Sequence, residues 1–422
     1  MPPVQHLCLP RMSLRKGVEK MKKKFREAQE VILALARPQG TTEVPLEEAL
    51  NRVLAQEVPS PLDLPPTDTS AMDGYALMAS STWNPPATLK VVGEAPAGCT
   101  HPPPVGPGEG VLVTTGGPIP PGADAVVKVE EVVEEGDRIT INRRVEPGEL
   151  INLKGQDLAR GQILLSPGTT LDFRKVALLA SVGAKRVKVF ERPRVALMAT
   201  GNELLEPGEP WQQGMLYNTN RYIVEGLLKG EGVEVDYLGI LPDDPDILRK
   251  ELGEALDRYP LVVTTGAVSR GKYDHLRWVL ETLGVKLHIT STNIKPGHPL
   301  AFGTRGSTIF FGLPGYPSAT LVNALVYLLP GVRKMKGELR PLPSTLPALA
   351  GEPFKSRKDR VYFIRVNLER QGKTLVARSA GSQLTSNYLS SALCQGLAIL
   401  PEEVEVVERG QTVEVLVLEK GW

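Results

Sequence analysis

The run RVALMATGNE, residues 194–203, decides the fold prediction because an uninterrupted apolar stretch leads directly into a glycine-containing turn. Two later runs repeat this arrangement: LVVTTGAVS at 261–269 and TIFFGLPG at 308–315. Amphipathic segments separate the runs, so residues 193–337 are predicted to alternate strands and helices around parallel strands. Ligands of such sheets bind at the carboxyl ends of the strands, where glycine admits the ligand and helix N-termini offer N–H groups to phosphate. The three loops therefore predict a phosphate-bearing ligand.

The remainder of the chain shows other patterns. Residues 16–57 have apolar residues at helical spacing, among them Leu46, Leu50 and Val53, and predict two helices. Short β-branched runs between Gly/Pro turns from about 87 to 157 predict a small all-β module. A further helix is expected between Asp172 as N-cap and Gly183 as stop. Strand-like runs after the proline-rich segment 341–347 predict a C-terminal β-barrel or sandwich.

The predicted fold class is multidomain α/β plus β: a three-layer α/β domain with an N-terminal helical/β part and a small C-terminal β-barrel or sandwich. The expected domains are a discontinuous N-terminal linking domain at 1–60 and 158–192, a small all-β domain at 61–157, the α/β domain at 193–337 and the C-terminal β domain at 338–422.

Composition excludes several classes of function. The 422 residues are 41% hydrophobic and 23% charged, with no apolar run long enough to span a bilayer. A formal charge of +1 provides no excess of positive charge for binding the phosphates of long nucleic acids. We expect a cytoplasmic protein with neither a nucleic-acid nor a membrane partner. The basic cluster 15–26 is predicted to be a solvated helix face, and the widely spaced Cys8, Cys99 and Cys394 to be free thiols.

Carboxylates are the candidate chemical groups. Glu203, Asp243 and Asp274 each stand beside an expected strand end or helix start, from which they could converge on one cleft. Oxygen ligands suit Mg²⁺, which bridges to substrate phosphates and could activate cleavage of a phosphoanhydride. Taken singly, each acid is more often a cap or a solvated charge, and Asp244 before Pro245 has the pattern of a plain helix N-cap. Thr200-Gly201 and Thr265-Gly266 could likewise be simple tight turns.

The segment DTSAMDGYA, residues 68–76, resembles the DNSAMDGYA signature of the molybdopterin molybdenumtransferase family, often called MoeA, which also includes the gephyrin E domain. Further matches follow in the family's order over nearly the whole chain: VTTG at 113–116, GADAVV at 122–127, KGQD at 154–157, TGNEL at 200–204, NTN at 218–220, DD at 243–244, TGAVS at 265–269, YD at 273–274, IKPG at 294–297 and GLPG at 312–315.

The resemblance implies an enzyme that inserts molybdate into adenylylated molybdopterin with release of AMP, using Mg²⁺ or another divalent metal. It implies a homodimer of four-domain subunits with the active site between subunits. Domain three is a molybdopterin-binding α/β domain like that of the related adenylyltransferases, and domain four, at 338–422, is a small β-barrel. The upstream molybdopterin adenylyltransferase is implied as a further partner. The implied catalytic and metal-binding residues are Asp73, Glu203, Asp243 and Asp274, with Asp73, Thr115 and Asp157 of one subunit facing the other three acids of the partner. The implied substrate-binding residues are Thr115, Asp157, Thr200, Gly201, Gly266, Ser269, Lys295, Pro314, Gly315, Pro317, Arg365 and Ser382.

Five positions depart from the family pattern. Asn202 replaces the aspartate of TGDE, Ala267 the second glycine of GGVS, and Tyr316 the asparagine of GLPGNP, after which this chain has one residue fewer. Ser291 and His298 stand where the family usually has lysines. A serine or neutral histidine does not replace a fixed positive charge. The departures thus bear on the molybdate step more than on pterin binding. They leave open a diverged paralogue that binds or delivers molybdopterin without inserting metal. A scaffold like gephyrin ranks last, because nothing in the sequence indicates receptor partners.

Overall fold

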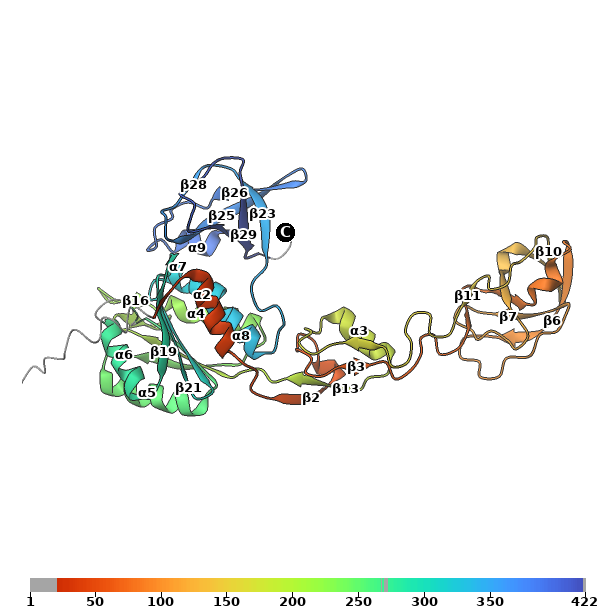
Figure 1. Cartoon of the computed structure of the whole chain (residues 1–422), viewed down its shortest axis with the longest axis horizontal. Coiled ribbons are helices and arrows are strands. Elements are labelled where there is room, and N and C mark those ends of the chain that lie inside the picture. The colour runs from red at the N-terminus through yellow and green to blue at the C-terminus, as the bar shows by residue number, and fades with distance from the viewer. Residues whose placement is uncertain (1–20, 267, 269–271, 420–422) are drawn as a thin grey trace, which may run out of the picture. The chain divides into compact units, whose positions relative to one another are not determined.

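The computed structural model describes residues 21–266, 268 and 272–419, and of residues 272–274 only the backbone. The chain divides into two compact units, one within 1–55, 168–172 and 186–422 and the other within 56–167 and 173–185. Figure 1 shows the course of the chain by colour. The four-domain division expected from the sequence is finer than this one and stays a prediction.

A seven-stranded sheet forms the centre of the first unit. Its order is β1 (Lys22–Lys23), β19 (Lys286–Thr292), β21 (Pro299–Arg305), β22 (Thr308–Leu313), β18 (Leu261–Thr265), β14 (Val195–Thr200) and β17 (Val235–Leu241). The last four strands are mutually parallel, whereas β21 runs antiparallel to both neighbours. The three parallel strands predicted from the apolar runs are confirmed as β14, β18 and β22.

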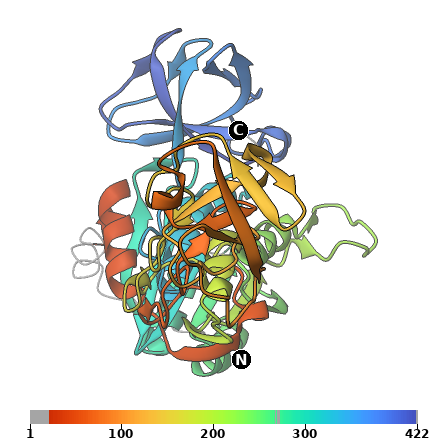
Figure 2. The same cartoon turned by 90° about the vertical axis from the view of Figure 1, so that its right-hand side faces the viewer.

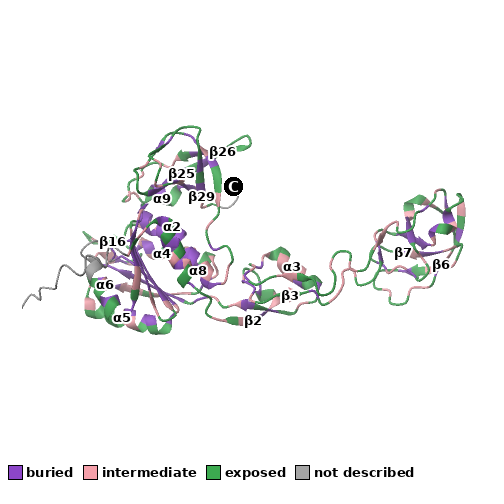
Figure 3. Cartoon of the chain, viewed as in Figure 1, coloured by how far each residue is buried: buried purple, intermediate pink, exposed green. Residues whose placement is uncertain are grey.

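Helices cover both faces of this sheet because successive residues of β14 point to opposite sides. Val195 and Leu197 join the core beneath one helical layer, and Ala196 and Met198 join the core beneath the other. The first layer consists of α2 (Phe25–Leu35), α4 (Thr219–Gly230), α7 (Pro317–Asn323), the π-helix η4 (Ala324–Leu328) and α8 (Leu329–Met335); the second consists of α5 (Pro245–Arg258) and α6 (Lys272–Thr282). Figure 3 shows buried, purple segments and exposed, green segments along α2 and α5. The expected three-layer domain is confirmed.

The C-terminal strands close into a five-stranded barrel in the order β25, β26, β23, β29, β27, with β25 also pairing with β27; it is blue in Figure 2. β20 (Ile294–Lys295) of the α/β domain pairs with β25 in parallel, which joins the two parts. The barrel region comprises β23 (Thr345–Ala350), β24 (Phe354–Lys355), β25 (Val361–Gln371), β26 (Thr374–Ser379), α9 (Leu389–Leu393), β27 (Gly396–Leu400), β28 (Val406–Val407) and β29 (Thr412–Val417). The predicted terminal β-barrel is confirmed.

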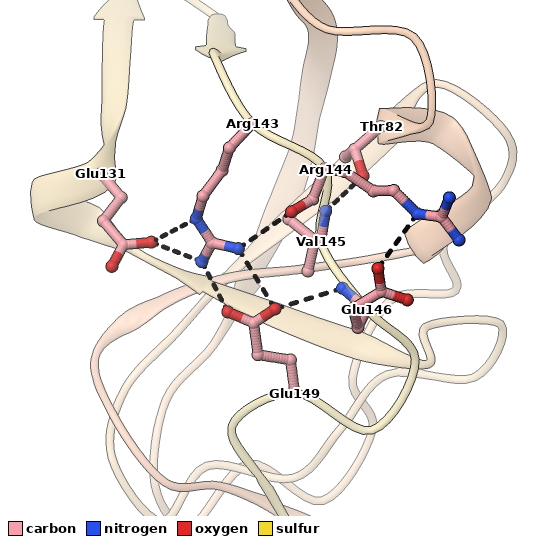
Figure 4. A network of polar contacts seen from close by, with 7 residues as sticks. All are labelled: Thr82, Glu131, Arg143, Arg144, Val145, Glu146 and Glu149. Atoms are coloured by element: carbon pink, nitrogen blue, oxygen red, sulfur yellow. Dashed lines mark hydrogen bonds and ion pairs between the residues drawn. The ribbon is translucent and has the colours of Figure 1, made fainter.

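The second unit is built on a six-stranded sheet in the order β8, β5, β7, β6, β10, β9. Gly74 at the start of β5 is required by packing, because a Cβ there would lie 2.1 Å from the carbonyl oxygen of Val127. Figure 4 shows Arg143 paired with Glu131 and Glu149, each at 2.5 Å, beside this sheet. The unit's elements are β3 (Val58–Pro59), β4 (Thr69–Ser70), β5 (Gly74–Leu77), η2 (Ala79–Thr82), β6 (Ala87–Ala95), β7 (Glu109–Val113), β8 (Ala125–Lys128), η3 (Val129–Glu131), β9 (Val132–Glu135), β10 (Arg138–Ile141), β11 (Ile151–Asn152), β12 (Ile163–Leu165) and α3 (Phe173–Ser181).

Two predictions near the N-terminus are wrong. The second helix expected within 16–57 is replaced by β2 (Thr41–Pro45), which pairs with β13 (Arg186–Phe190), and by the short 3₁₀ helix η1 (Leu46–Glu48). Long-range pairing overrides the helical spacing there: the N–H of Leu54 donates to Thr169, and Leu50 is half exposed. Lys22 and Lys23 of the basic cluster lie in strand β1, not on a helix face, and residues 15–20 lie outside the described part.

Within the described ranges, no helix combines the length and apolar character needed to cross a membrane.

Candidate ligand site at the carboxyl edge of the sheet

Three loops meet at the carboxyl ends of β14, β18 and β22. The hydroxyl of Thr200 donates to the carbonyl of Thr265 at 3.2 Å, and the N–H of Gly266 donates to the carbonyl of Leu313 at 3.0 Å. A Cβ placed on Gly315 would lie 3.9 Å from the Cα of Gly266. The structure therefore brings together Thr200, Gly201, Gly266, Pro314 and Gly315, five of the residues expected to bind substrate.

Glycine is required at this edge by conformation and by space. Gly201 and Gly266 have φ angles of +147° and +96°. A Cβ on Gly266 would lie only 2.3 Å from the carbonyl oxygen of Thr200, so any side chain would push the loops apart. Glycine at these positions therefore lets the loops pack tightly at the strand ends, which is where ligands of α/β sheets bind.

Asn220, in the first turn of α4, adds a polar side chain to the same edge. Asn218 caps the helix by accepting from the N–H of Arg221 at 3.3 Å, and Asn220 Nδ2 donates to the carbonyl of Gly315 at 2.8 Å. The Oδ1 atom of Asn220 and the hydroxyl of Thr265 are buried, with no hydrogen-bond partner among the described residues. Buried polar atoms are normally paired, so this pair of atoms fits a ligand that forms hydrogen bonds. Asn220 was not among the expected site residues, although its NTN motif was the available signal.

Asn202 connects two acidic loops. Its side-chain oxygen accepts a 3.0 Å hydrogen bond from the N–H of Asp243, which ties the loop carrying Glu203 to the loop after β17. The predicted N-cap role of Asp244 is confirmed, because its carboxylate accepts from the N–H groups of residues 246 and 247 and Pro245 occupies the first turn. Asp243 is not part of this cap, and it lies at the same end of the sheet as Glu203 because both follow the carboxyl ends of parallel strands.

Two expected residues cannot be located at this site. Asp274 falls in the first turn of α6, but its side chain is outside the described part, and Ser269 lies outside it altogether. Over the described residues, no group of three or more His, Cys, Asp or Glu side chains is placed to hold a metal ion.

Asp73, Thr115 and Asp157 all belong to the second unit and are exposed. Asp73 Oδ1 accepts from the backbone N–H of Thr115 at 2.6 Å and from its hydroxyl at 3.0 Å. The bond from the Thr115 backbone, followed by that from its hydroxyl, lowers the pKa of the Asp73 carboxyl. Asp157 donates its own N–H to the carbonyl of Leu64 at 3.0 Å.

Lys295, in β20, and Pro317, at the start of α7, follow strands β19 and β22, which both end at this edge. The Lys295 ammonium lies 5.4 Å from the ring centroid of Tyr362, a cation–π contact with the barrel. The loop after Lys295 is held by Asn323, whose amide donates to the carbonyl of Gly297 at 2.9 Å. Pro317 occupies the first turn of α7.

Arg365 and Ser382 belong to a buried arrangement in the barrel region. The Arg365 side chain is 2% exposed and donates to the carbonyls of Ser382 and Leu384 at 2.9 and 3.1 Å and to the hydroxyl of Ser391 at 3.3 Å. Burial lowers the pKa of this guanidinium. In the structure, Arg365 therefore positions the loop 382–391, and contact with substrate remains a prediction for both residues.

Comparisons with known proteins agree with one another over most of the chain. The family model of the MoeA N-terminal region (domain I and II) matches residues 23–183, that of the probable molybdopterin binding domain matches 196–334, and that of the MoeA C-terminal region (domain IV) matches 347–418. The chain is 35% identical to a molybdopterin molybdenumtransferase of Nostoc sp. over 90% of this chain and 89% of that protein. It is 34% identical to the one of Haemophilus influenzae over 90% and 94%. A crystal structure of the molybdopterin biosynthesis MoeA protein from Pyrococcus horikoshii superposes with a TM-score of 0.82 at 31% identity, covering 94% of this chain and all of that one.

Proposed function

The chain belongs to the MoeA family, and from this premise we propose that it inserts molybdate into adenylylated molybdopterin and releases AMP. It is a molybdopterin molybdenumtransferase, an enzyme of molybdenum cofactor biosynthesis. In the proposed reaction, water splits the bridging P–O bond of the phosphoanhydride. One phosphate stays on the pterin and the other leaves on AMP.

The edge formed by the loops after β14, β18 and β22 is the observation that carries this proposal. Gly201 and Gly266 give the loops their positive φ angles at the strand ends, where α/β sheets bind phosphate-bearing ligands, and the α4 N-terminus lies at the same edge. The unpartnered Asn220 Oδ1 and Thr265 hydroxyl suit a pterin, whose ring carries both N–H donors and acceptor atoms. The protein's contribution is to bind and orient the pterin next to the bond that breaks.

A divalent metal is part of the proposal. Glu203 and Asp243 offer carboxylate oxygens from two loops that Asn202 joins, and Asp73 and Asp274 are the other proposed ligands. Mg²⁺ prefers oxygen ligands and completes its coordination with water and substrate phosphates, so carboxylates at this edge suit it. When bound, it would neutralise charge on the phosphates and favour AMP as the leaving group.

We also propose a homodimer in which Asp73, Thr115 and Asp157 of one subunit act with the α/β-domain carboxylates of the partner. The motivation is that the proposed acids are divided between two units of the chain. A two-fold dimer would hold two equivalent sites. The upstream adenylyltransferase is the proposed supplier of the adenylylated pterin.

The test is incubation of the protein with adenylylated molybdopterin, molybdate and Mg²⁺, with AMP measured by chromatography and cofactor measured by activation of an apo-molybdoenzyme. Parallel reactions omit molybdate or add a chelator. We expect molybdate-dependent AMP release and active cofactor. Tight pterin binding without AMP release would overturn the proposal and indicate a delivery protein.

A further inference from the structure

A polar network at the start of α4 is centred on the hydroxyl group of Tyr237, a residue of the edge strand β17. This hydroxyl donates a hydrogen bond to the Glu206 carboxylate and accepts one from Asn218 Nδ2 at 2.9 Å. The same nitrogen of Asn218 lies 3.3 Å from Glu206 Oε1. Burial, followed by the bond to Glu206, raises the pKa of Tyr237, so the hydroxyl keeps its proton at neutral pH and remains a donor. Three segments of the chain therefore meet at one tyrosine.

The network fixes the orientation of the Asn218 side-chain amide. A carboxylate only accepts hydrogen bonds, so the amide nitrogen must face Glu206 and the amide oxygen must face α4. That oxygen accepts from the N–H of Arg221 at 3.3 Å and caps the helix. Because Asn218 is only 1% exposed, protein groups and not bulk water satisfy its amide. The cap at the start of α4 therefore depends on Tyr237 and Glu206.

Arg221 supports the network from the first turn of α4. Its guanidinium carbon lies 3.9 Å from the ring centroid of Tyr237, a distance at which a cation is attracted to the face of the ring. The same guanidinium pairs with Glu206 and with Glu225, each at 3.3 Å. These contacts hold the first turn of the helix against β17.

The segments joined by the network also carry residues of the candidate site. Backbone bonds connect them, because the N–H of Leu216 donates to the carbonyl of Glu203 at 2.7 Å. Asn220, two residues after Asn218, carries the unpartnered Oδ1 atom. Any movement of the cap at Asn218 is therefore passed on to the Asn220 side chain.

We propose that Tyr237 and Glu206 are positioning residues for the pterin, because they hold the Asn218 cap so that Asn220 presents its Oδ1 atom to the ligand. The inference deepens the proposed function and rests on it for the identity of the ligand. Without the Tyr237 hydroxyl, the Asn218 amide loses one of its partners and the first turn of α4 is less ordered. The ligand must then order this turn as it binds, which lowers its affinity. The change falls on pterin binding and not on the rate at which bound substrate releases AMP.

The test measures the dissociation constant of adenylylated molybdopterin by isothermal titration of the full-length protein without molybdate. Tyr237→Phe keeps the ring beneath Arg221 and removes only the hydroxyl. The control is Tyr222→Phe, because Tyr222 belongs to the same helix, is 52% exposed and has no hydrogen bond from its hydroxyl among the described residues. Glu206→Ala removes the acceptor, whereas Glu206→Gln retains an acceptor oxygen. Urea unfolding of each variant verifies folding.

Tyr237→Phe and Glu206→Ala should each weaken pterin binding by roughly fivefold, the factor that corresponds to a hydrogen bond of about 1 kcal/mol. Glu206→Gln and the Tyr222 control should bind like the wild type. In the AMP-release assay, Tyr237→Phe should raise KM for the pterin by the same factor and leave kcat unchanged. A general structural defect would instead lower kcat as well.

A double-mutant cycle with Asn220→Ala tests whether Tyr237 acts through Asn220. If it does, Tyr237→Phe should weaken binding no further once the Asn220 side chain is gone. Wild-type affinity in Tyr237→Phe, or losses that multiply in the double variant, would overturn the proposal. Because the titration needs no turnover, tight pterin binding without AMP release would reject the proposed function and leave this test intact.

Discussion

The side-chain oxygen of Asn202 accepts a 3.0 Å hydrogen bond from the backbone N–H of Asp243. This bond joins the loop that carries Glu203 to the loop that carries Asp243. The spacing of the two proposed metal-binding carboxylates therefore depends on a side chain that has no charge.

We expect Asn202→Ala to lower molybdate-dependent AMP release by roughly fivefold, because a hydrogen bond of this kind contributes about 1 kcal/mol. Asn202→Asp retains an acceptor oxygen at the same place and should keep most of the activity. The measurement is initial rate against Mg²⁺ concentration, in which Asn202→Ala should require more metal. Equal Mg²⁺ dependence in all three proteins would show that the hydrogen bond between Asn202 and Asp243 does not affect metal binding.

The contact between Gly266 and Thr200 gives a second prediction. Gly266→Ala places a Cβ 2.3 Å from the Thr200 carbonyl at a φ of +96°, so the variant should be destabilised by about 1–3 kcal/mol and should bind pterin poorly. Gly226→Ala in α4 meets no atom within 4 Å and should instead gain stability of about 0.5–1 kcal/mol. Chemical denaturation and pterin titration measure both effects.

Gly315→Ala separates folding from binding. Its Cβ would meet nothing nearer than 3.9 Å, so the protein should fold normally. The added methyl would nevertheless project at the loop edge, and we expect a weaker pterin affinity with unchanged unfolding. An unchanged pterin affinity would show that the ligand does not contact Gly315.

The α/β core was predictable because its strands are buried on both faces. Runs such as residues 195–199 are apolar at every position, and a turn with glycine follows each, so pattern alone locates them. The helix expected around Leu46 to Val53 failed for the opposite reason. Its backbone bonds with residues 169–190, which are distant in sequence, and spacing within one segment cannot reveal such pairing.

The candidate site was predictable only in part. Glycines at strand ends are visible in the sequence, and so is the cap at Asp244. The orphaned Oδ1 of Asn220 depends on how α4 meets the loop at Gly315, which no local pattern contains. Lys22 and Lys23 resembled part of a helix face because their partner strand, β19, lies more than 260 residues away in the sequence.

A buried ion cluster at the C-terminal end of α4 gives a prediction on stability. Glu231 pairs with Arg333 at 2.6 Å and with Lys336 at 3.0 Å, and the Lys336 side chain is only 5% exposed. Glu231→Gln should cost about 1.5–3 kcal/mol, because the buried Lys336 then keeps Glu338, at 3.1 Å, as its one acidic partner among the described residues. The double variant Glu231→Gln/Lys336→Met should recover much of that loss in urea unfolding. Additive losses would argue against coupling between the two residues.

The same cluster predicts how stability depends on pH. Burial raises the pKa of Glu231, but the hydrogen bond from Arg333 and the charges of Lys336 and Arg333 outweigh burial, so the pKa lies below its ordinary value. Its stabilising contribution is therefore complete above the ordinary glutamate pKa of about 4.3 and is lost as pH falls through the lowered value. Wild type should lose more stability than Glu231→Gln between neutral and acidic pH, as measured by the urea midpoint. Parallel profiles would contradict this.

The proposed dimer makes the last prediction. Asp73 lies in the second unit, where two hydrogen bonds from Thr115 hold its carboxylate, and Glu203 follows β14 in the first unit. If each site takes Asp73 from one subunit and Glu203 from the other, Asp73→Asn and Glu203→Gln homodimers are both inactive. A mixed dimer, however, contains one site with both substitutions and one intact site.

Random exchange gives about half mixed dimers, so the mixture should recover about a quarter of wild-type AMP release. Differently tagged subunits, purified in tandem after exchange, isolate the mixed dimer and should show half the wild-type rate. An inactive mixed dimer, with tagged wild-type dimers active after the same treatment, would place both carboxylates in the same subunit's site.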